Sequence, residues 1–516
     1  MPQSTETEIK LVASPSMLCR LREHSALAAA ERTQTLRTTY FDTAGRRLGK
    51  NGASLRIRET EAAPPVQTLK LVTAAGAVRR REWTTEIADD VPEVAAFART
   101  PKILLRRLTG GVPMHPFAVI ETTRTIRTIR RGRSEIEVAF DVGVVRAGDR
   151  RLEICELELE LVRGRLADVI ALASELPLGP DLRWSAVSKA ERGELLAFDL
   201  ALDAQRARQP ALRPAMDAAQ GFAAIGWSCL GQLLANHEAV LMTGDAEAVH
   251  QARVAVRRLR VAVRGFRRIV EDDAGGVLGA ELKAAAQMLG KVRDLDVLIA
   301  RVLAARPICA AASAELIAEL AARRAQALAA VRSMLAGDAF QHLLFAIATW
   351  LESGDWRRRK PGGFGPALLP DHAARVLSRW LRKLHKRSAR LDELADRELH
   401  RVRKDAKTLR YFAEFLAGLD GDGAAGIARV AFVDALAAAQ DALGAVQDAA
   451  AARSIGEDVF AAAEPLDAAR LQEELRQLLD GTGVRRKKKL KQARRSLKAA
   501  WDSPAWWLPV TDGPTN

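Results

Sequence analysis

The pattern of apolar and polar residues divides the chain into two parts with different periods. Through about residue 200, short segments alternate apolar and polar residues and are separated by turns such as Asp42–Gly45 and Asn51-Gly52. Alternation with period two predicts β-strands. Only two stretches of this part, near Pro92–Leu108 and Leu166–Glu175, have helical periodicity. We therefore predict a mainly β-domain with a few helices, and strands at Thr5–Val12, Ser54–Arg58, Gln67–Val72, Glu82–Ile87, Ser134–Val142 and Ile154–Val162.

The rest of the chain is predicted to be helical. The segment Gln205–Pro214 is rich in Arg, Gln and Pro, which is typical of a linker. Beyond it, Ala, Leu and Arg recur at helical spacing with almost no strand signal, and a loop from Ser353 to Gly363 divides this region into similar halves. We expect a β-domain at 1–204, a linker at 205–215 and a helical domain at 216–507, with halves at about 216–352 and 371–507.

Charged residues share one face of several predicted strands. Residues i and i+2 of a strand point the same way. Four predicted strands each carry such a charged face. These faces contain Glu6, Glu8 and Lys10; Arg56 and Arg58; Glu135, Glu137 and Asp141; and Glu156, Glu158 and Glu160. Lys70 and Glu82 add to the set. For any one strand, the simpler interpretation is a sheet with its polar face in water.

The whole set favours a charged interior. Rows of carboxylates repel each other unless cations lie among them. Here carboxylate rows alternate along the chain with Arg and Lys rows, and a barrel with inward charged faces would bring them together. Carboxylate oxygens suit Mg²⁺ or Mn²⁺, and Arg and Lys bind phosphate oxygens. Metal-assisted cleavage of a phosphoanhydride requires this combination.

These residues, in this order, resemble the CYTH, or triphosphate tunnel metalloenzyme, superfamily. Glu6-Thr7-Glu8-Ile9-Lys10 matches its ExExK motif, and the resemblance covers about residues 4–200. It implies an eight-stranded antiparallel tunnel, a divalent metal, and hydrolysis or cyclisation of triphosphate-bearing substrates. The further matching segments are Tyr40–Thr43, Leu55–Arg58, Thr68–Lys70, Arg81–Trp83, Arg124–Arg127, Glu137 with Asp141, Glu156–Leu161, and Lys189 with Arg192.

The resemblance also implies roles for individual residues. It implies Glu6, Glu8 and Lys10 as catalytic residues. As metal ligands it implies Glu6, Glu8, Glu158 and Glu160, with Glu156 and Asp141 as ligands or as supports of the ligands. Its implied triphosphate contacts are Lys10, Arg56, Arg58, Lys70, Arg124, Arg127 and Lys189. Four arginines between Arg124 and Arg131 leave the register of that strand open.

The helical part contains an internal repeat of basic stripes. His250, Arg253, Arg257, Arg260, Arg264 and Arg267 are spaced 3-4-3-4-3, and His400, Arg403, Lys407 and Arg410 repeat the first three spacings. This spacing places each set on one helical face, next to an apolar face. A solvated basic face would normally include acidic residues for pairing, but none lies between Gln251 and Val270. A polyanion is therefore the natural partner of both stripes.

This repeat resembles the CHAD family of conserved-histidine α-helical domains over about residues 216–507. A Leu-Gly-x-Val-x-Asp element follows each stripe, at Leu289–Asp294 and at Leu443–Asp448. The family implies a pseudo-symmetric helical bundle that binds inorganic polyphosphate in a basic groove, and fused CYTH–CHAD chains are associated with inorganic triphosphatase activity. The residues implied as polyphosphate contacts are His250, Arg253, Arg257, Arg260, His400, Arg403, Lys404, Lys407 and Arg410.

Composition agrees with a phosphate polymer as partner. The net charge of +15 indicates a polyanion. Aromatic residues are only 5%, which argues against nucleic acid because single strands bind by stacking on aromatic rings. The four cysteines form no CxxC pair, so we expect a reducing compartment. We expect no membrane segment and a cytoplasmic protein, with polyphosphate granules as a candidate location.

We therefore predict an inorganic triphosphatase of mixed α and β class: an N-terminal antiparallel β-tunnel followed by an all-α polyphosphate-binding domain, with Mg²⁺ or Mn²⁺ as cofactor. Two alternatives stay open. One is hydrolysis or cyclisation of an organic triphosphate such as a thiamine or nucleoside triphosphate. The other is a non-catalytic protein that binds polyphosphate granules.

Overall fold

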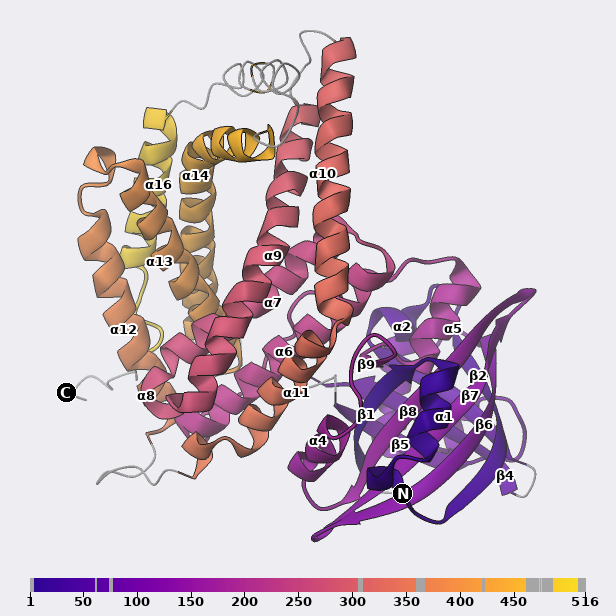
Figure 1. Ribbon diagram of the computed structural model, residues 1–516. Helices are drawn as coiled ribbons and strands as arrows, with labels where there is room; N and C mark the ends of the chain where they lie inside the picture. Colours follow the sequence, from indigo (N-terminus) through magenta and orange to yellow (C-terminus); the bar gives the residue numbers. More distant parts are fainter. Residues whose placement is uncertain are drawn as a thin grey trace, which may run out of the picture. The chain divides into compact units, whose positions relative to one another are not determined.

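The computed structural model describes residues 4–60, 63–73, 78–304, 310–358, 367–419, 423–460, 473, 475 and 486–508. The chain forms two compact units, which Figure 1 colours along the sequence. The first comprises Met1–Arg208, Trp227–Ala252 and Arg332–Gly354, and the second comprises Gln209–Gly226, Arg253–Val331 and Asp355–Asn516. The first unit therefore includes helical segments from beyond the predicted linker, so the units do not follow the predicted domain boundaries.

The described residues of the first unit form the predicted closed antiparallel barrel. Eight strands follow each other in the order β5-β4-β3-β2-β6-β7-β8-β1, and pairing of β1 with β5 closes the barrel. The short β9 (Leu182–Trp184) pairs with the end of β1. The bounds are β1 Ser4–Ala13, β2 Glu31–Thr43, β3 Ala53–Thr60, β4 Ala63–Val72, β5 Arg79–Glu86, β6 Met114–Arg131, β7 Ser134–Ala147 and β8 Arg150–Arg163.

Alternation along the strands separates an apolar outer face from a charged inner face. On β1, Ile9 and Leu11 are fully buried on the face opposite Glu8, on the side of α1 (Pro15–Arg22) and α4 (Leu166–Ser174). On β3 to β5, a core that includes Leu55 and Trp83 packs beneath α3 (Arg99–Thr109). Burying these outer faces fixes the register, because a slip of one residue would turn the charged rows outward.

Helix α5 (Lys189–Phe198) packs inside one end of the barrel. Ala190 belongs to a buried cluster with Tyr40, Ala118, Val145 and Ile154. These strand residues have the same parity as the charged inner rows, so they lie on the inner face. Ser188 caps the helix by accepting a hydrogen bond from the Glu191 backbone N–H at 3.2 Å. The cap places Lys189 at the first turn, on the side of the charged interior.

Four later helices contribute to the described residues of the first unit: parts of α6 (Ala218–Met242), α7 (Ala246–Gly265) and α10 (Ala310–Ala336), and all of α11 (Asp338–Ser353). Trp184 of β9 is fully buried and stacks on Phe345, with ring centroids 4.4 Å apart. The Trp184 backbone N–H donates to Gln341 Oε1 at 3.0 Å, and the Gln341 side chain contacts buried His237 at 3.2 Å. Burial lowers the pKa of His237 to about 4, so this histidine is a neutral core residue at pH 7.

The second unit is helical, as predicted. The helices that lie wholly or partly in it are α6, α7, α8 (Arg267–Val270), α9 (Asp273–Ala304), α10 (Ala310–Ala336), α12 (Leu369–Ser388), α13 (Asp396–Phe415), α14 (Ala424–Phe460) and α16 (Arg486–Asp502). Among the described residues, no single helix is long and apolar enough to cross a membrane; one pair bent by 55°, Ala314–Ala336 with Asp338–Arg357, reaches that length and composition only when taken together.

Candidate active site

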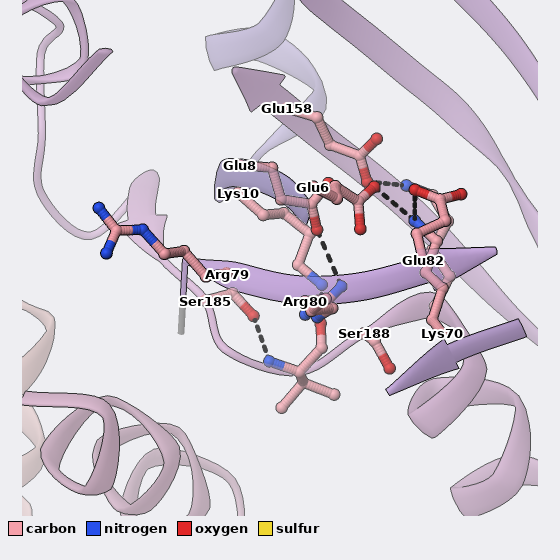
Figure 2. A network of polar contacts seen from close by, with 12 residues as sticks. Glu6, Glu8, Lys10, Lys70, Arg79, Arg80, Glu82, Glu158, Ser185 and Ser188 are labelled. Atoms are coloured by element: carbon pink, nitrogen blue, oxygen red, sulfur yellow. Dashed lines mark hydrogen bonds and ion pairs between the residues drawn. The ribbon is translucent and has the colours of Figure 1, made fainter. Parts of the chain in front are cut away.

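Strands β1 and β8 bring the predicted carboxylates together inside the barrel. Their register sets Glu8 opposite Glu160 and Lys10 opposite Glu158. Glu6 and Glu8 are each 8% exposed and Lys10 is 3% exposed. Figure 2 shows Glu6, Glu8 and Glu158 gathered with cationic side chains, whereas Arg79 points away from them. The two segments are about 150 residues apart in sequence, so this convergence depends on closure of the barrel.

Cations from β3, β4 and β5 lie among these carboxylates. Lys70 Nζ makes a short contact with Glu6 Oε1 and lies 3.8 Å from Glu82 Oε2. Arg80 Nη1 donates to Glu8 Oε1 at 2.9 Å. Cations of β4 and β5 therefore lie beside the carboxylates of β1 and β5, which makes the inward rows of carboxylates tolerable.

Lys189 is the centre of a second buried network. Its Nζ lies 2.8 Å from Asp141 Oδ2, 2.8 Å from Glu156 Oε2 and 2.6 Å from Glu158 Oε1. Arg124 binds the same group with a fork, donating from Nε and Nη2 to the two Asp141 oxygens at 2.8 and 2.6 Å. The Lys189 charge lowers the pKa of Glu158 well below its ordinary range despite the opposing effect of burial, the largest single influence.

Lys10 is fixed by the chain that leads into α5. Its Nζ makes a short hydrogen bond to the Val187 carbonyl, and the Val187 N–H donates to Ser185 Oγ at 3.2 Å. The Ser185 N–H in turn donates to the Lys10 carbonyl at 2.9 Å. Burial lowers the pKa of Lys10. The ammonium group is thus held in place by neutral backbone, and no carboxylate of the described residues lies within ion-pair distance of it.

The carboxylates on β1 and β8 still carry more negative charge than their neighbours balance. Burial, and then the charges of Glu6 and Glu158, raise the pKa of Glu8. Burial, and then Glu6 and Glu8, raise the pKa of Glu160 to about 7. The opposite imbalance occurs on β3, where burial and then Arg56 and Arg124 lower the pKa of Arg58 to about 10.

These groups line one cavity of about 650 Å³. The lining carries charges of both signs, and its apolar residues include Phe117 of β6, Leu195 of α5 and Leu202. The predicted residues in the lining are Glu6, Glu8, Lys10, Arg56, Arg58, Lys70, Arg124, Glu158, Glu160 and Lys189. The arrangement can therefore hold a polyanion on cations and, beside it, a cation on carboxylates.

The carboxylates fit a hard divalent cation. Glu6 Oε2 is buried and has no hydrogen-bond partner, and the raised pKa values of Glu8 and Glu160 indicate that a further positive charge would be stabilised there. Among the described residues, no group of three His, Cys, Asp or Glu side chains is already close enough to hold a metal ion. The reason is visible in the contacts, since Lys70 and Arg80 occupy one oxygen each of Glu6 and Glu8.

The structure places one predicted phosphate contact, Arg127, outside the cavity. Arg127 donates to Glu31 Oε2 at 2.8 Å and to the carbonyls of Arg22 and Leu27, and it is not in the cavity lining. Arg127 is three residues from Arg124, so the two side chains lie on opposite faces of β6. Glu156 is 1% exposed and also lies outside the lining; it bridges Lys189 and Arg192, which supports the alternative that it positions other residues.

One residue of the site was not predicted. Arg80 lines the cavity and pairs with Glu8, whereas the family motif directed attention to Arg81 and Glu82. Glu82 lines the cavity too, and residues 80 and 82 share one face of β5. Period-two spacing from Glu82 would therefore have identified Arg80.

In the second unit, the two basic stripes meet. The charges of Arg253, Arg403 and Arg260 lower the pKa of Arg257 further than burial alone does. Lys407 of α13 lies in the field of Arg257, Arg410 and Arg403, and burial together with these charges lowers its pKa to about 7. Directly after α7, Phe266 packs against Phe412 of α13, with ring centroids 5.8 Å apart.

The two copies of the repeat have equivalent packing. A Cβ placed on Gly290 of α9 would lie 3.7 Å from Arg253 Nε, and a Cβ on Gly444 of α14 would lie 2.9 Å from Arg403 Nη2. The glycine of each Leu-Gly element thus lies beside the arginine three residues after each histidine; an added Cβ would make ordinary contact at Gly290 but would be too close at Gly444. His250 is half-buried, while His400, Arg260 and Lys404 are exposed. The side chains of Gln447 and Asp448 lie outside the described residues.

Comparisons with known proteins agree with the family resemblances predicted for the N-terminal and the helical parts of the chain. The CYTH domain family matches residues 4–193 and the CHAD domain family matches residues 224–456. A curated protein of Haemophilus influenzae, named inorganic triphosphatase, is 30% identical over 197 residues, which are 37% of this chain and 54% of that protein. This chain thus aligns with about half of the length of that relative.

The helical region also resembles a solved structure. The CHAD domain of the plant Ricinus communis is 26% identical, with a TM-score of 0.51, and the match covers 58% of this chain and 97% of that one. This similarity agrees with the predicted fold of the helical region.

Proposed function

Because this chain contains a CYTH domain at residues 4–193 and a CHAD domain at residues 224–456, we propose that it is a metal-dependent inorganic triphosphatase whose helical domain binds polyphosphate. The observation that carries the proposal is the state of Arg58. Arg58 is half-buried in the cavity lining and has no ion pair with any described carboxylate, and its buried Nε has no hydrogen-bond partner. An anion with several oxygens supplies the missing partners.

The cavity residues then divide into two groups. Arg56, Arg58 and Arg124 hold the phosphate oxygens and neutralise the charge that builds up on the leaving diphosphate. Lys10 and Lys189, fixed by the Val187 carbonyl and by buried carboxylates, fix the substrate's position without having to reorganise.

Glu6, Glu8, Glu158 and Glu160 are the residues that would hold Mg²⁺ or Mn²⁺. Bound there, the ion would neutralise phosphate charge and lower the pKa of a coordinated water. Lys70 and Arg80 pair with Glu6 and Glu8 in the structure, and they would be available to contact phosphate oxygens if these carboxylates held the ion. In the overall reaction, water adds to a terminal phosphorus, the P–O bond to the bridging oxygen breaks, and orthophosphate and diphosphate leave.

Steady-state hydrolysis of tripolyphosphate by Arg58→Gln tests the site. Loss of a hydrogen-bonded charge contact costs about 1.5–3 kcal/mol, so kcat/KM should fall roughly 10- to 100-fold. Arg151→Gln is the matched control, because Arg151 is exposed on β8 and pairs only with Glu153 two residues away. Equal rates in wild type, Arg58→Gln and the control would contradict the proposed site.

Polyphosphate binding by the helical domain rests on the stripes of α7 and α13. Burial, and then the repulsion between these cations, lowers the pKa values of Arg257 and Lys407, and a bound polyanion relieves the repulsion. The double variant Arg257→Ala with Arg410→Ala should bind long-chain polyphosphate more weakly and with a smaller salt slope, because fewer counterions are released. Unchanged affinity and slope would mean that the stripes are only a solvated face.

A further inference from the structure

The segment predicted as a linker forms part of the cavity wall. Besides the charged centre, the lining of the cavity includes Leu200–Asp203, Gln205, Arg206 and Arg208. Opposite wall positions come from α6, where Ser228, Gly231, Gln232 and Ala235 have the spacing of one helical face. All of these residues belong to the first compact unit.

Side chains of α6 fasten this segment in place. Asn236 is fully buried, and its Oδ1 accepts from the Gln205 N–H at 2.9 Å while its Nδ2 donates to the Gln205 carbonyl at 2.7 Å. About two turns earlier in α6, Ser228 Oγ donates a hydrogen bond to the Arg208 carbonyl at 2.6 Å. The backbone from 205 to 208 is therefore held at both ends, so the side chains of this stretch have a defined position at the cavity.

The guanidinium of Arg208 lies against the turn that precedes β3. A Cβ on Gly52 would lie 3.1 Å from Arg208 Nη2, and Gly52 has a φ of +67°, so both space and backbone conformation favour glycine there. Lys50 precedes this turn and also lines the cavity. Lys50, Arg206 and Arg208 thus extend the row of cations from the charged centre toward α6.

These three cations differ from the others at this end of the cavity. Arg46 is paired with Glu194 at 2.6 Å, and Asp42 is occupied by the N–H groups of Leu48 and Gly49. By contrast, Lys50, Arg206 and Arg208 make no ion pair with any described residue. The remaining carboxylates in this part of the lining are Glu191, whose pKa is raised by burial, and Asp203. The cations and carboxylates at this end are thus equal in number, but Lys50, Arg206 and Arg208 are not held by an ion pair with any described carboxylate and can contact an anion directly.

We propose that Lys50, Arg206 and Arg208 form an outer subsite for the phosphates of a linear polyphosphate that extend beyond the three held at the charged centre. The inference rests on the proposed function and adds a preference for chain length. A fourth phosphate leaving the centre toward α6 meets unpaired cations on a fastened backbone, so binding requires little further ordering. A tripolyphosphate does not reach them and gains nothing.

Hydrolysis of tripolyphosphate and of tetrapolyphosphate by the full chain tests this subsite. The double variant Arg206→Gln with Arg208→Gln should lose about 10-fold or more in kcat/KM for tetrapolyphosphate, because a charged hydrogen bond contributes about 1.5–3 kcal/mol. For tripolyphosphate the change should stay within about 3-fold. Arg213→Gln is the control, since Arg213 is exposed in the same segment but is not in the cavity lining.

The outcomes separate the subsite from the proposed function. An equal loss on both substrates, or no loss on either, would overturn the subsite while leaving the triphosphatase intact. If the wild-type chain hydrolyses neither substrate, the proposed function fails, and calorimetric titration of the two phosphates still tests the subsite. In that case, tighter binding of tetrapolyphosphate that disappears in the double variant supports it, and equal binding overturns it.

Discussion

Replacing Lys189 with methionine should destabilise the barrel in a way that depends on pH. The change removes one cation from among three buried carboxylates, Asp141, Glu156 and Glu158, at nearly constant side-chain volume. Arg124 still pairs with Asp141 and with Glu158, and Arg192 still lies 3.1 Å from Glu156. At least one buried carboxylate is then left with too little positive charge.

Protonation of that carboxylate limits the loss of folding free energy in the variant. A glutamate has an ordinary pKa of 4.5, so adding a proton at pH 7 costs about 3 kcal/mol, and at pH 5 about 1 kcal/mol, at 1.36 kcal/mol per pH unit. The upper value agrees with the roughly 3–5 kcal/mol expected for breaking a buried ion pair. We therefore expect a loss of about 3 kcal/mol at pH 7 that shrinks to about 1 kcal/mol at pH 5.

The direction of the pH dependence of stability follows from the linkage between proton binding and folding. In the wild type, the folded pKa values of Glu156 and Glu158 lie below 4.5, so their stabilising contribution is fully present above that pH and is lost as the pH falls through the folded values. Between pH 5 and 7 the wild type is therefore nearly flat. In the variant the folded pKa of the unpaired carboxylate is raised, so the folded state binds an extra proton and its stability falls as the pH rises.

Native-state hydrogen exchange of the β8 amides measures this difference. Opening free energies should be compared at pH 5 and 7 after correction for the intrinsic exchange rates, with Lys102→Met on α3 as control. A loss that is equal at the two pH values, or below about 1 kcal/mol at pH 7, would refute the argument from unpaired carboxylates.

Three further predictions follow from single contacts. Glu238→Leu should lower kcat for tripolyphosphate by about 5- to 10-fold with little change in melting temperature, because Glu238 Oε2 accepts a hydrogen bond from Ser185 Oγ at 2.6 Å and so holds the segment that fixes Lys10; unchanged kcat would refute this role. Trp184→Ala should cost about 3–5 kcal/mol in thermal unfolding, and its effect should not add to that of Phe345→Ala, because the two rings stack; full additivity would contradict the contact. Polyphosphate affinity should rise as the pH falls from 8 to 6, since a bound anion favours protonated Lys407, whose pKa is about 7, and Lys407→Arg should reduce this dependence; an equal pH dependence in both would exclude Lys407.

Period-two alternation, together with the exchange of acidic and basic rows along the chain, predicted the inner face of the barrel. It placed Glu6, Glu8 and Lys10 together because a strand has only two faces and the other one is apolar. The prediction for Arg127 came from the family motif and was wrong, whereas period two places Arg127 on the face opposite Arg124 and would have identified Arg80. Contacts between strands far apart in sequence, such as Glu8 with Arg80, depend on barrel closure, which no local pattern encodes.

The extent of the first unit could not be predicted from local sequence. Gln205–Pro214 has the composition of a flexible linker, yet Asn236 and Ser228 hold its first residues at the cavity. The segment is held by side chains of α6 that bond to its backbone. Backbone groups are the same for every residue type, so the composition of the segment does not reveal these bonds. Similarly, Trp184 finds its partner in Phe345, more than 150 residues away.

The repeat was the clearest signal in the helical region, for a physical reason. The buried face of a helix has apolar residues at spacings of three and four. A basic stripe next to that face has the same spacing and can therefore be recognised in the sequence. The role of Gly290 and Gly444 was not visible, because it depends on where Arg253 and Arg403 lie on a neighbouring helix.

Phosphate release by the full-length chain tests the central claim most directly. Tripolyphosphate, long-chain polyphosphate, ATP and thiamine triphosphate should each be offered with Mg²⁺ and with Mn²⁺, and again after chelation. We expect hydrolysis of tripolyphosphate that requires one of the metals, stops on chelation, and falls at least about 100-fold in Glu8→Gln. Release that persists without metal, or a preference for ATP or thiamine triphosphate over tripolyphosphate, would contradict the account.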